Sequence, residues 1–139
     1  MLKKTIKYTD FDGNEQTEDF YFNLTKAELM EMNLSASGGL EKKLQRIINE
    51  RDVTKIAEIF KDLILRAYGK KSDDGKRFIK NEEIKAEFAQ TEAYSELFME
   101  LLGDTSASVA FIKGIVPKDI QTELDKQDLT TLSIVNPQK

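Results

Sequence analysis

Paired carboxylates are the side chains of this chain with the chemistry for catalysis. Glu82 stands next to Glu83, and Glu96 precedes Glu100 by four residues. Two carboxylates at a suitable separation act as general acid and base in glycoside hydrolysis. On an amphipathic helix, however, adjacent or i,i+4 acids ordinarily form a solvated face. We therefore interpret both pairs as surface charges and predict no catalytic residues.

The composition removes most other catalytic chemistry. The 139 residues include no histidine, no cysteine and no tryptophan. The commonest general base, the thiolate nucleophile and nearly every zinc ligand set are thereby excluded. The sequence has no nucleophile elbow, kinase motif set or phosphate-binding P-loop either. We predict that the protein is not an enzyme, and the lack of cysteine means that its fold depends on a hydrophobic core.

Acidic turns and a glycine pair have some features of ligand sites. The acids lie at residues 10–14 and 73–75, and the glycines are Gly38 and Gly39. A calcium loop needs oxygen ligands at alternating positions, glycine at the sixth and glutamate at the twelfth, and neither turn has this spacing. No phosphate-binding motif follows the glycine pair, so a linker is the better interpretation. We expect no metal and no cofactor.

The charge balance argues against a nucleic-acid or membrane partner. There are 25 acidic and 21 basic side chains, and the net charge is -4. An acidic protein repels phosphate backbones unless its basic residues cluster, and here most do not. The basic start lacks the apolar run of a signal peptide, and no segment approaches the ~20 apolar residues of a membrane span. We expect the protein to stay in the cytoplasm where it is made.

The first 24 residues have the alternation of a β-hairpin. Apolar and polar residues alternate in residues 2–9 and again in residues 19–24, and a half-buried strand requires this period of two. Gly13 and Asn14, which tolerate positive φ, lie between them. A lone hairpin is marginal in water. We expect its face of Ile6, Phe20 and Phe22 to lie against helices.

Capping residues mark the helices that follow. Thr25 and Glu28 form a capping box for a helix with Leu29, Met30 and Leu34 facing inward. Residues 40–48 form another helical pattern. Asp52 can cap a third helix with an apolar stripe, for which we expect the C-terminal stop to be Gly69. That stripe contains Val53, Ile56, Ile59, Phe60, Leu63, Ile64 and Ala67.

The second half continues this pattern after a polar turn over residues 70–80. Asn81 and Thr91 are positioned to cap two helices, and Asp104 or Thr105 a last one. We expect Gly114, with Pro117 behind it, to end the last helix.

The fold class predicted from these patterns is α+β. An N-terminal β-hairpin should pack on a mainly helical body of about five or six helices. Residues 1–117 should form a single globular domain, and residues 118–139 a partly disordered C-terminal tail with a short frayed helix through Ile120 and Leu124. Leu129, Leu132 and Val135 are too sparse for a core of their own, which leaves a plain tail or a segment that folds on binding.

The aromatic stripe between residues 88 and 111 has two interpretations. Aromatic side chains at helical spacing usually form core, although spacing alone does not distinguish a buried face from an interface. Methionine suits surfaces that bind adaptable partners. If part of the stripe is exposed, we therefore expect the partner-binding residues to be Tyr94, Phe98, Met99 and Leu102.

Residues 68–117 contain sequence motifs that resemble those of a known family. The order of motifs is similar to that of the small tail assembly chaperones of long-tailed, siphovirus-type phages and prophages of Gram-positive bacteria. The similarity extends back to the hairpin and covers about 110 residues. The motifs are Asp19-Phe20-Tyr21-Phe22-Asn23-Leu24-Thr25-Lys26-Ala27-Glu28, Tyr68-Gly69, Ser72-Asp73-Asp74-Gly75-Lys76-Arg77-Phe78, Gln90-Thr91-Glu92-Ala93-Tyr94-Ser95-Glu96-Leu97-Phe98-Met99-Glu100-Leu101 and Phe111-Ile112-Lys113-Gly114-Ile115-Val116-Pro117.

This resemblance implies a role in virion assembly. Chaperones of this kind bind the helical, apolar tape measure protein, keep it soluble and help to recruit tail tube subunits around it. They are usually absent from the mature virion, and many also exist in a longer form made by ribosomal frameshifting. The alternative is a structural tail or head-tail connector protein, with a regulatory binding protein of the same mobile element as a third hypothesis. Self-association through the apolar stripes also remains open.

Overall fold

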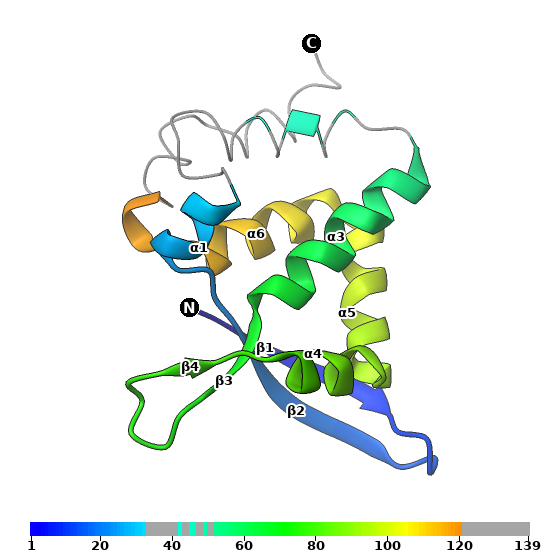
Figure 1. Ribbon diagram of the computed structural model, residues 1–139. Coiled ribbons are helices and arrows are strands. Elements are labelled where there is room, and N and C mark those ends of the chain that lie inside the picture. Colours follow the sequence, from blue (N-terminus) through cyan, green and yellow to red (C-terminus); the bar gives the residue numbers. More distant parts are fainter. Residues whose placement is uncertain (33–41, 43–44, 47–48, 50–51, 121–139) are drawn as a thin grey trace.

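The computed structural model describes residues 1–32, 42, 45–46, 49 and 52–120 (Figure 1). The predicted α+β class is confirmed, because an N-terminal β-hairpin packs on a helical body. The elements with their bounds are β1 (Leu2–Thr9), β2 (Glu15–Phe22), α1 (Lys26–Glu31), α3 (Val53–Ala67), β3 (Tyr68–Lys71), β4 (Phe78–Ile79), α4 (Glu82–Ala89), α5 (Glu92–Gly103) and α6 (Thr105–Ile115).

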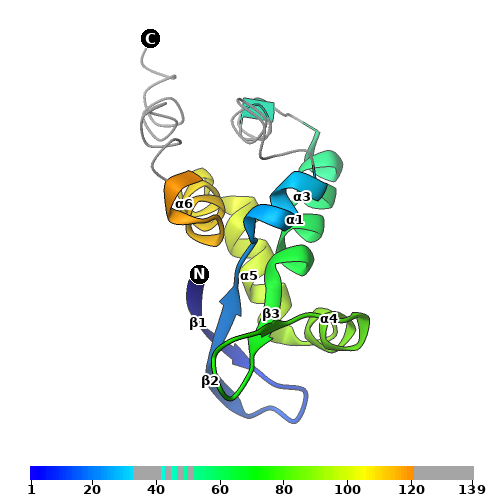
Figure 2. The ribbon, with the colours of Figure 1, turned by 60° about the vertical axis from the view of Figure 1, so that its left-hand side comes forward.

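The sheet is built on the predicted hairpin. Strands β1 and β2 pair antiparallel over their whole length, from Leu2 opposite Phe22 to Thr9 opposite Glu15. The sheet order is β1-β2-β3-β4, and β3 pairs with only the last two residues of β2. The helices lie on one face of the hairpin (Figure 2), and Lys3, Thr5 and Lys7 are exposed on the other face.

The interpretation of residues 70–80 as only a polar turn is wrong. Strands β3 and β4 form a second hairpin there, with Lys70 opposite Ile79. Gly69 is also not a helix stop, because α3 ends at Ala67 and Gly69 is a strand residue. A Cβ at this position would lie 2.7 Å from the Phe78 ring and 2.9 Å from the Ile79 carbonyl oxygen. Close packing of strand on strand therefore explains this glycine.

The predicted N-caps are confirmed. The Thr25 hydroxyl accepts from the Glu28 amide, and the Glu28 carboxylate accepts from the Thr25 amide, which completes the capping box. The side chains of Asp52, Asn81, Thr91 and Asp104 each accept from one amide in the first turn of their own helix. Each cap satisfies an amide that has no partner inside its helix.

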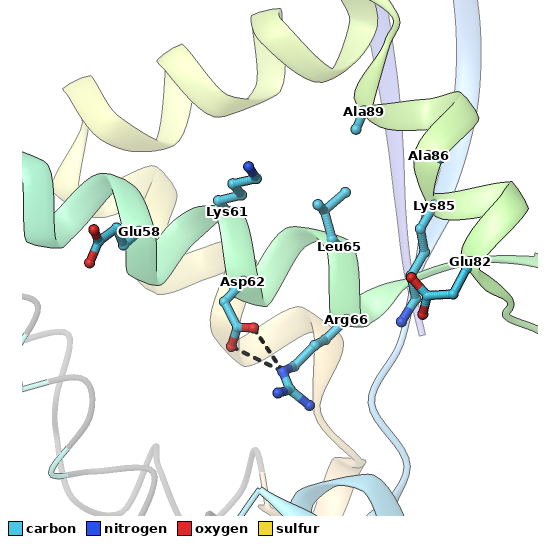
Figure 3. Close-up of a pocket in the computed structure, with 9 residues that line it drawn as sticks. All are labelled: Glu58, Lys61, Asp62, Leu65, Arg66, Glu82, Lys85, Ala86 and Ala89. Atoms are coloured by element: carbon cyan, nitrogen blue, oxygen red, sulfur yellow. Dashed lines mark hydrogen bonds and ion pairs between the residues drawn. The ribbon is translucent and has the colours of Figure 1, made fainter.

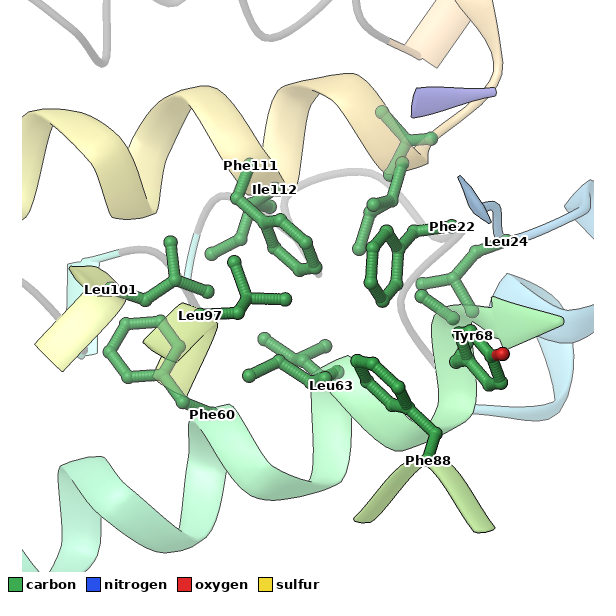
Figure 4. Packing of buried hydrophobic residues seen from close by; sticks show 14 of the residues in the cluster. Phe22, Leu24, Phe60, Leu63, Tyr68, Phe88, Leu97, Leu101, Phe111 and Ile112 are labelled. Atoms are coloured by element: carbon green, nitrogen blue, oxygen red, sulfur yellow. The ribbon is translucent and has the colours of Figure 1, made fainter. Parts of the chain in front are cut away.

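The core is centred on aromatic rings from the hairpin and the helices (Figure 4). Phe22 is fully buried, with ring centroids 5.4 Å from Phe111, 5.7 Å from Tyr68 and 5.9 Å from Phe88. Ile6 is also buried, and Phe20 packs against the same cluster. The expectation that this face of the hairpin lies on the helices is thus confirmed.

Other expectations about individual positions are wrong. Met30 is 67% exposed and Val53 is 63% exposed, although both were predicted to face the core. Each lies in a terminal turn of its helix, so helical spacing alone does not place it against the core. Gly114 does not stop α6, which continues to Ile115. It lies where Leu2 of β1 approaches, with a Cβ position 2.9 Å from Leu2 Cδ1.

Several sequence predictions lie outside the described residues. They include Leu34, the glycine linker, most of the helix predicted over residues 40–48 and the tail after Ile120. Within residues 40–48, positions 42, 45 and 46 are described and are helical, as predicted. Lys118 to Ile120 are described and helical. The Lys26 ammonium lies 2.7 Å from the Asp119 carboxylate, and Ile120 is partly buried against the core.

Lys80 connects segments that are far apart in the sequence. Its ammonium donates to the Asn23 carbonyl at 2.8 Å, to Glu28 at 2.7 Å and to the Arg66 carbonyl at 2.7 Å. Burial lowers the pKa of Lys80, while its bond to Glu28 acts in the opposite direction. Burial works to raise the pKa of Glu28, but hydrogen bonds from Lys80 and Thr25 outweigh it and the pKa is lowered. The pair fixes α1 beside the end of α3.

Candidate functional site

Helix α5 carries all of the predicted partner-binding residues. Thr91 caps the helix, which directs Ala93, Leu97 and Leu101 into the core. Tyr94, Phe98 and Leu102 follow one another in i,i+4 steps along the neighbouring sector of the helix, and Met99 lies one turn before Leu102 at i,i+3. Of these, Tyr94, Phe98 and Leu102 are partly buried, and Met99 is 60% exposed. We call these four residues the α5 patch.

The rings of the α5 patch belong partly to the core. Tyr94 meets Phe88 edge to face at 5.7 Å, and Phe98 lies 5.8 Å from Tyr94. Burial raises the pKa of the Tyr94 phenol. The core interpretation therefore applies to the inner side of Tyr94, Phe98 and Leu102, while Met99 is exposed to solvent. An exposed thioether beside anchored aromatic rings is a surface that can adapt to apolar side chains.

Charged side chains border the α5 patch. Glu96 and Glu100 are exposed on the same helix. The Lys4 ammonium of β1 donates to Glu100 at 3.1 Å, which ties the C-terminal part of α5 to the sheet. This pair is solvent-accessible, so its contribution to stability is small. The Lys4–Glu100 ion pair places charged groups next to Met99.

A groove of about 650 Å³ lies between α3 and α4 (Figure 3). Its apolar lining comes from Leu65 of α3 and from Ala86 and Ala89 of α4, and alanines allow another backbone to approach closely. Charged side chains of both signs surround this lining: Glu58, Lys61, Asp62, Arg66, Glu82 and Lys85. The groove therefore combines a small apolar floor with a charged rim.

Sequence reasoning missed this groove. Asp62 and Arg66 were detectable as an i,i+4 pair on one helix. In the structure Arg66 Nε lies 2.9 Å from Asp62 Oδ1. Ala86 and Ala89 belong to a different helix, and only the packing of α3 beside α4 makes them neighbours of Leu65. No local pattern in the sequence encodes that juxtaposition.

The acidic residues considered for chemistry are placed at the surface or used within turns. Glu82 and Glu83 are exposed in the first turn of α4, where acids suit the helix dipole. The Asp74 carboxylate accepts from Ser72 and from the Lys76 amide, so it stabilises the turn between β3 and β4. Within the described residues, no group of three His, Cys, Asp or Glu side chains is placed to hold a metal ion.

Comparison with known families identifies the class of protein. The whole chain, residues 1–139, matches the family model described as phage tail assembly chaperone. The chain belongs to this family. The resemblance drawn from the sequence motifs is thereby confirmed at the level of the family. Comparisons with curated proteins and with solved structures gave no match.

Membership gives the two surfaces a context. A tail assembly chaperone is an assembly factor whose partners are proteins of the phage tail. In this tail assembly chaperone, Met99 of the α5 patch is exposed, and the groove between α3 and α4 opens to solvent. No helix in the described ranges has the length and apolar character needed to cross a membrane.

Proposed function

We propose that this protein binds the tape measure protein, keeps it soluble and helps to recruit tail tube subunits during tail morphogenesis. It does so in the host cytoplasm, without catalysis, for long-tailed phages or prophages of Gram-positive bacteria, and it does not remain in the mature virion. The family match supports the general role in tail assembly. The α5 patch supports the more specific role as a binder of apolar helices.

The exposure of Met99 carries this proposal. An apolar side chain that is 60% exposed costs the free protein hydration free energy that a partner can recover. Amphipathic helices dock by placing their apolar side chains at i, i+3 and i+4 against such surfaces. A tape measure protein, as a long apolar helix, presents that arrangement repeatedly. Met99 would contact it first, with the outer edges of Phe98 and Leu102 beside it.

Co-expression of the chaperone with its tape measure protein tests the proposal. The soluble yield of the tape measure protein should rise with the wild-type chaperone. Met99→Lys should lose most of this effect, because it places a charge where apolar contact is needed. Met30→Lys is the matched control, since Met30 is 67% exposed on α1 and lies away from the patch. Circular dichroism should give the same spectrum for both variants.

A third variant separates the two surfaces. Ala86→Glu fills the groove between α3 and α4 from an exposed position and should leave solubilisation intact. If Ala86→Glu abolishes solubilisation and Met99→Lys does not, the assignment to the α5 patch is wrong. Phe98 is partly buried, so its substitution by aspartate should instead lower stability. Mass spectrometry of purified virions distinguishes the alternative, because a structural tail component would be present in the particle.

A further inference from the structure

The turn between β1 and β2 holds a phenylalanine in solvent. Phe11 is 77% exposed, more than any other large hydrophobic side chain in the described part of the chain. The turn projects beyond the helices at the end of the molecule away from α1 and α6 (Figures 1 and 2). A single exposed apolar residue is ordinary on a protein surface. Phe11 differs because the turn around it is tightly fixed and strongly charged.

Hydrogen bonds define the conformation of this turn. The Asp10 carboxylate accepts from the Asp12 amide at 3.0 Å, from the Asn14 amide at 2.9 Å and from the Gln16 side chain at 2.8 Å. The Asp10 amide donates to the Asn14 carbonyl, and the Gly13 amide donates to the Asp10 carbonyl. Gly13 has a φ of 86°, which glycine adopts without strain. The backbone on both sides of Phe11 is therefore held in one geometry before any partner binds.

The surroundings of Phe11 are acidic. Residues 10–19 contain five acids, at positions 10, 12, 15, 18 and 19, and no lysine or arginine. Asp12 follows Phe11 directly and Glu15 begins β2, and both are exposed. Such a field favours a partner surface of positive charge and disfavours an acidic one. An aromatic side chain surrounded by charges of one sign has the composition of an interface anchor with a polar rim.

We propose that the hairpin turn is a second docking element, in which Phe11 inserts into an apolar pocket rimmed by Lys or Arg on a folded partner protein. A projecting ring needs a concave receptor, and a folded subunit can provide one whereas the convex surface of a helix does not. The fixed turn lowers the ordering cost of binding. This inference rests on the proposed function, in which the tail tube subunit is the folded partner and the tape measure protein occupies the α5 patch.

The test measures both partners with the same variants of the full-length chaperone. Phe11→Ser should weaken binding of the purified tail tube subunit at least about tenfold in calorimetry. Phe11→Leu keeps an apolar anchor and should retain affinity to within about threefold. Asp12→Lys should also weaken binding, and wild-type affinity should fall as salt rises. Co-expression with each variant should still solubilise the tape measure protein.

The outcomes separate this inference from the proposed function. Failure of the wild type to solubilise the tape measure protein would refute the proposed function. A different result would refute only the role of Phe11: the wild type binds the tape measure protein, and Phe11→Ser binds the tube subunit as tightly as the wild type does. So would loss of tape measure solubilisation by Phe11→Ser, since the turn would then serve the first site. A change in oligomeric state by Phe11→Ser in light scattering, without a change in tube binding, would identify a second copy as the occupant and overturn the inference.

Discussion

Replacing Gly69, Gly103 and Gly114 by alanine, one at a time, makes one chemical change in three surroundings. At Gly69 the new methyl group would lie 2.7 Å from the Phe78 ring and 2.9 Å from the Ile79 carbonyl oxygen. At Gly114 it would lie 2.9 Å from the end of the Leu2 side chain, and at Gly103 nothing lies within 4 Å. The structure therefore predicts a different change in stability at each position.

The magnitudes follow from these contacts. Gly103 is the last residue of α5 and its φ is not positive, so alanine should stabilise the protein by about 0.4–1 kcal/mol, chiefly by restricting the unfolded chain. Gly114→Ala should stabilise the helix by a similar amount, but the new methyl group must displace the Leu2 side chain. The two effects should nearly cancel, so stability should change by no more than about 0.5 kcal/mol. At Gly69 one of the blocking atoms is the Ile79 carbonyl oxygen, and a backbone atom cannot rotate away as a side chain can. We expect Gly69→Ala to cost about 1–3 kcal/mol.

Urea and thermal unfolding followed by circular dichroism measure these changes. For a chain of this size, about 1 kcal/mol corresponds to roughly 4 °C in Tm. The sequence interpretation of Gly69 and Gly114 as helix stops would instead make both alanines costly, because a helix-stop glycine normally has positive φ. Equal losses at Gly69 and Gly114, or a loss at Gly103, would refute the reasoning from packing.

Three further predictions concern single side chains. Thr25→Ala removes the capping hydroxyl of α1 and should cost about 1 kcal/mol in urea unfolding, whereas Thr25→Ser should cost little. Glu28 has a pKa lowered from 4.5, so the stability that it confers is present above that pH and lost as the pH falls through the lower folded-state pKa. Glu28→Gln should accordingly flatten the decline of Tm in acid, and an unchanged decline would contradict this. The bond from the Tyr8 phenol to Glu18 is the largest cause that raises the pKa of Tyr8 to about 12, so Glu18→Gln should lower that pKa in an ultraviolet titration.

Features that depend on near neighbours in the sequence could be predicted. The Thr25 capping box and the Asn81 cap were readable because donor and acceptor lie within three residues of each other. The first hairpin was readable because both strands are long enough to display a period of two. The stripe on α5 was likewise found from helical spacing. These elements are locally encoded.

Features that depend on distant partners could not be predicted. Strands β3 and β4 are too short to display alternation, and β3 exists because Gly69 pairs with Tyr21. The sequence did not reveal that Phe98 is partly buried while its neighbour Met99 is exposed, because both lie within the same apolar stripe. The groove between α3 and α4 arises because both helices pack against α5. In each case the deciding contact spans many residues of chain.

The bonds of Lys80 have a consequence for the order of folding. Its acceptors lie 57, 52 and 14 residues away along the chain, in three segments that must all be in place first. We expect contacts of this kind to form after the folding transition state, so they should contribute little to the folding rate and much to the unfolding rate. In a chevron plot, Lys80→Met should leave the refolding limb unchanged and raise the unfolding limb. Lys80 would then govern how long each molecule persists in its native state.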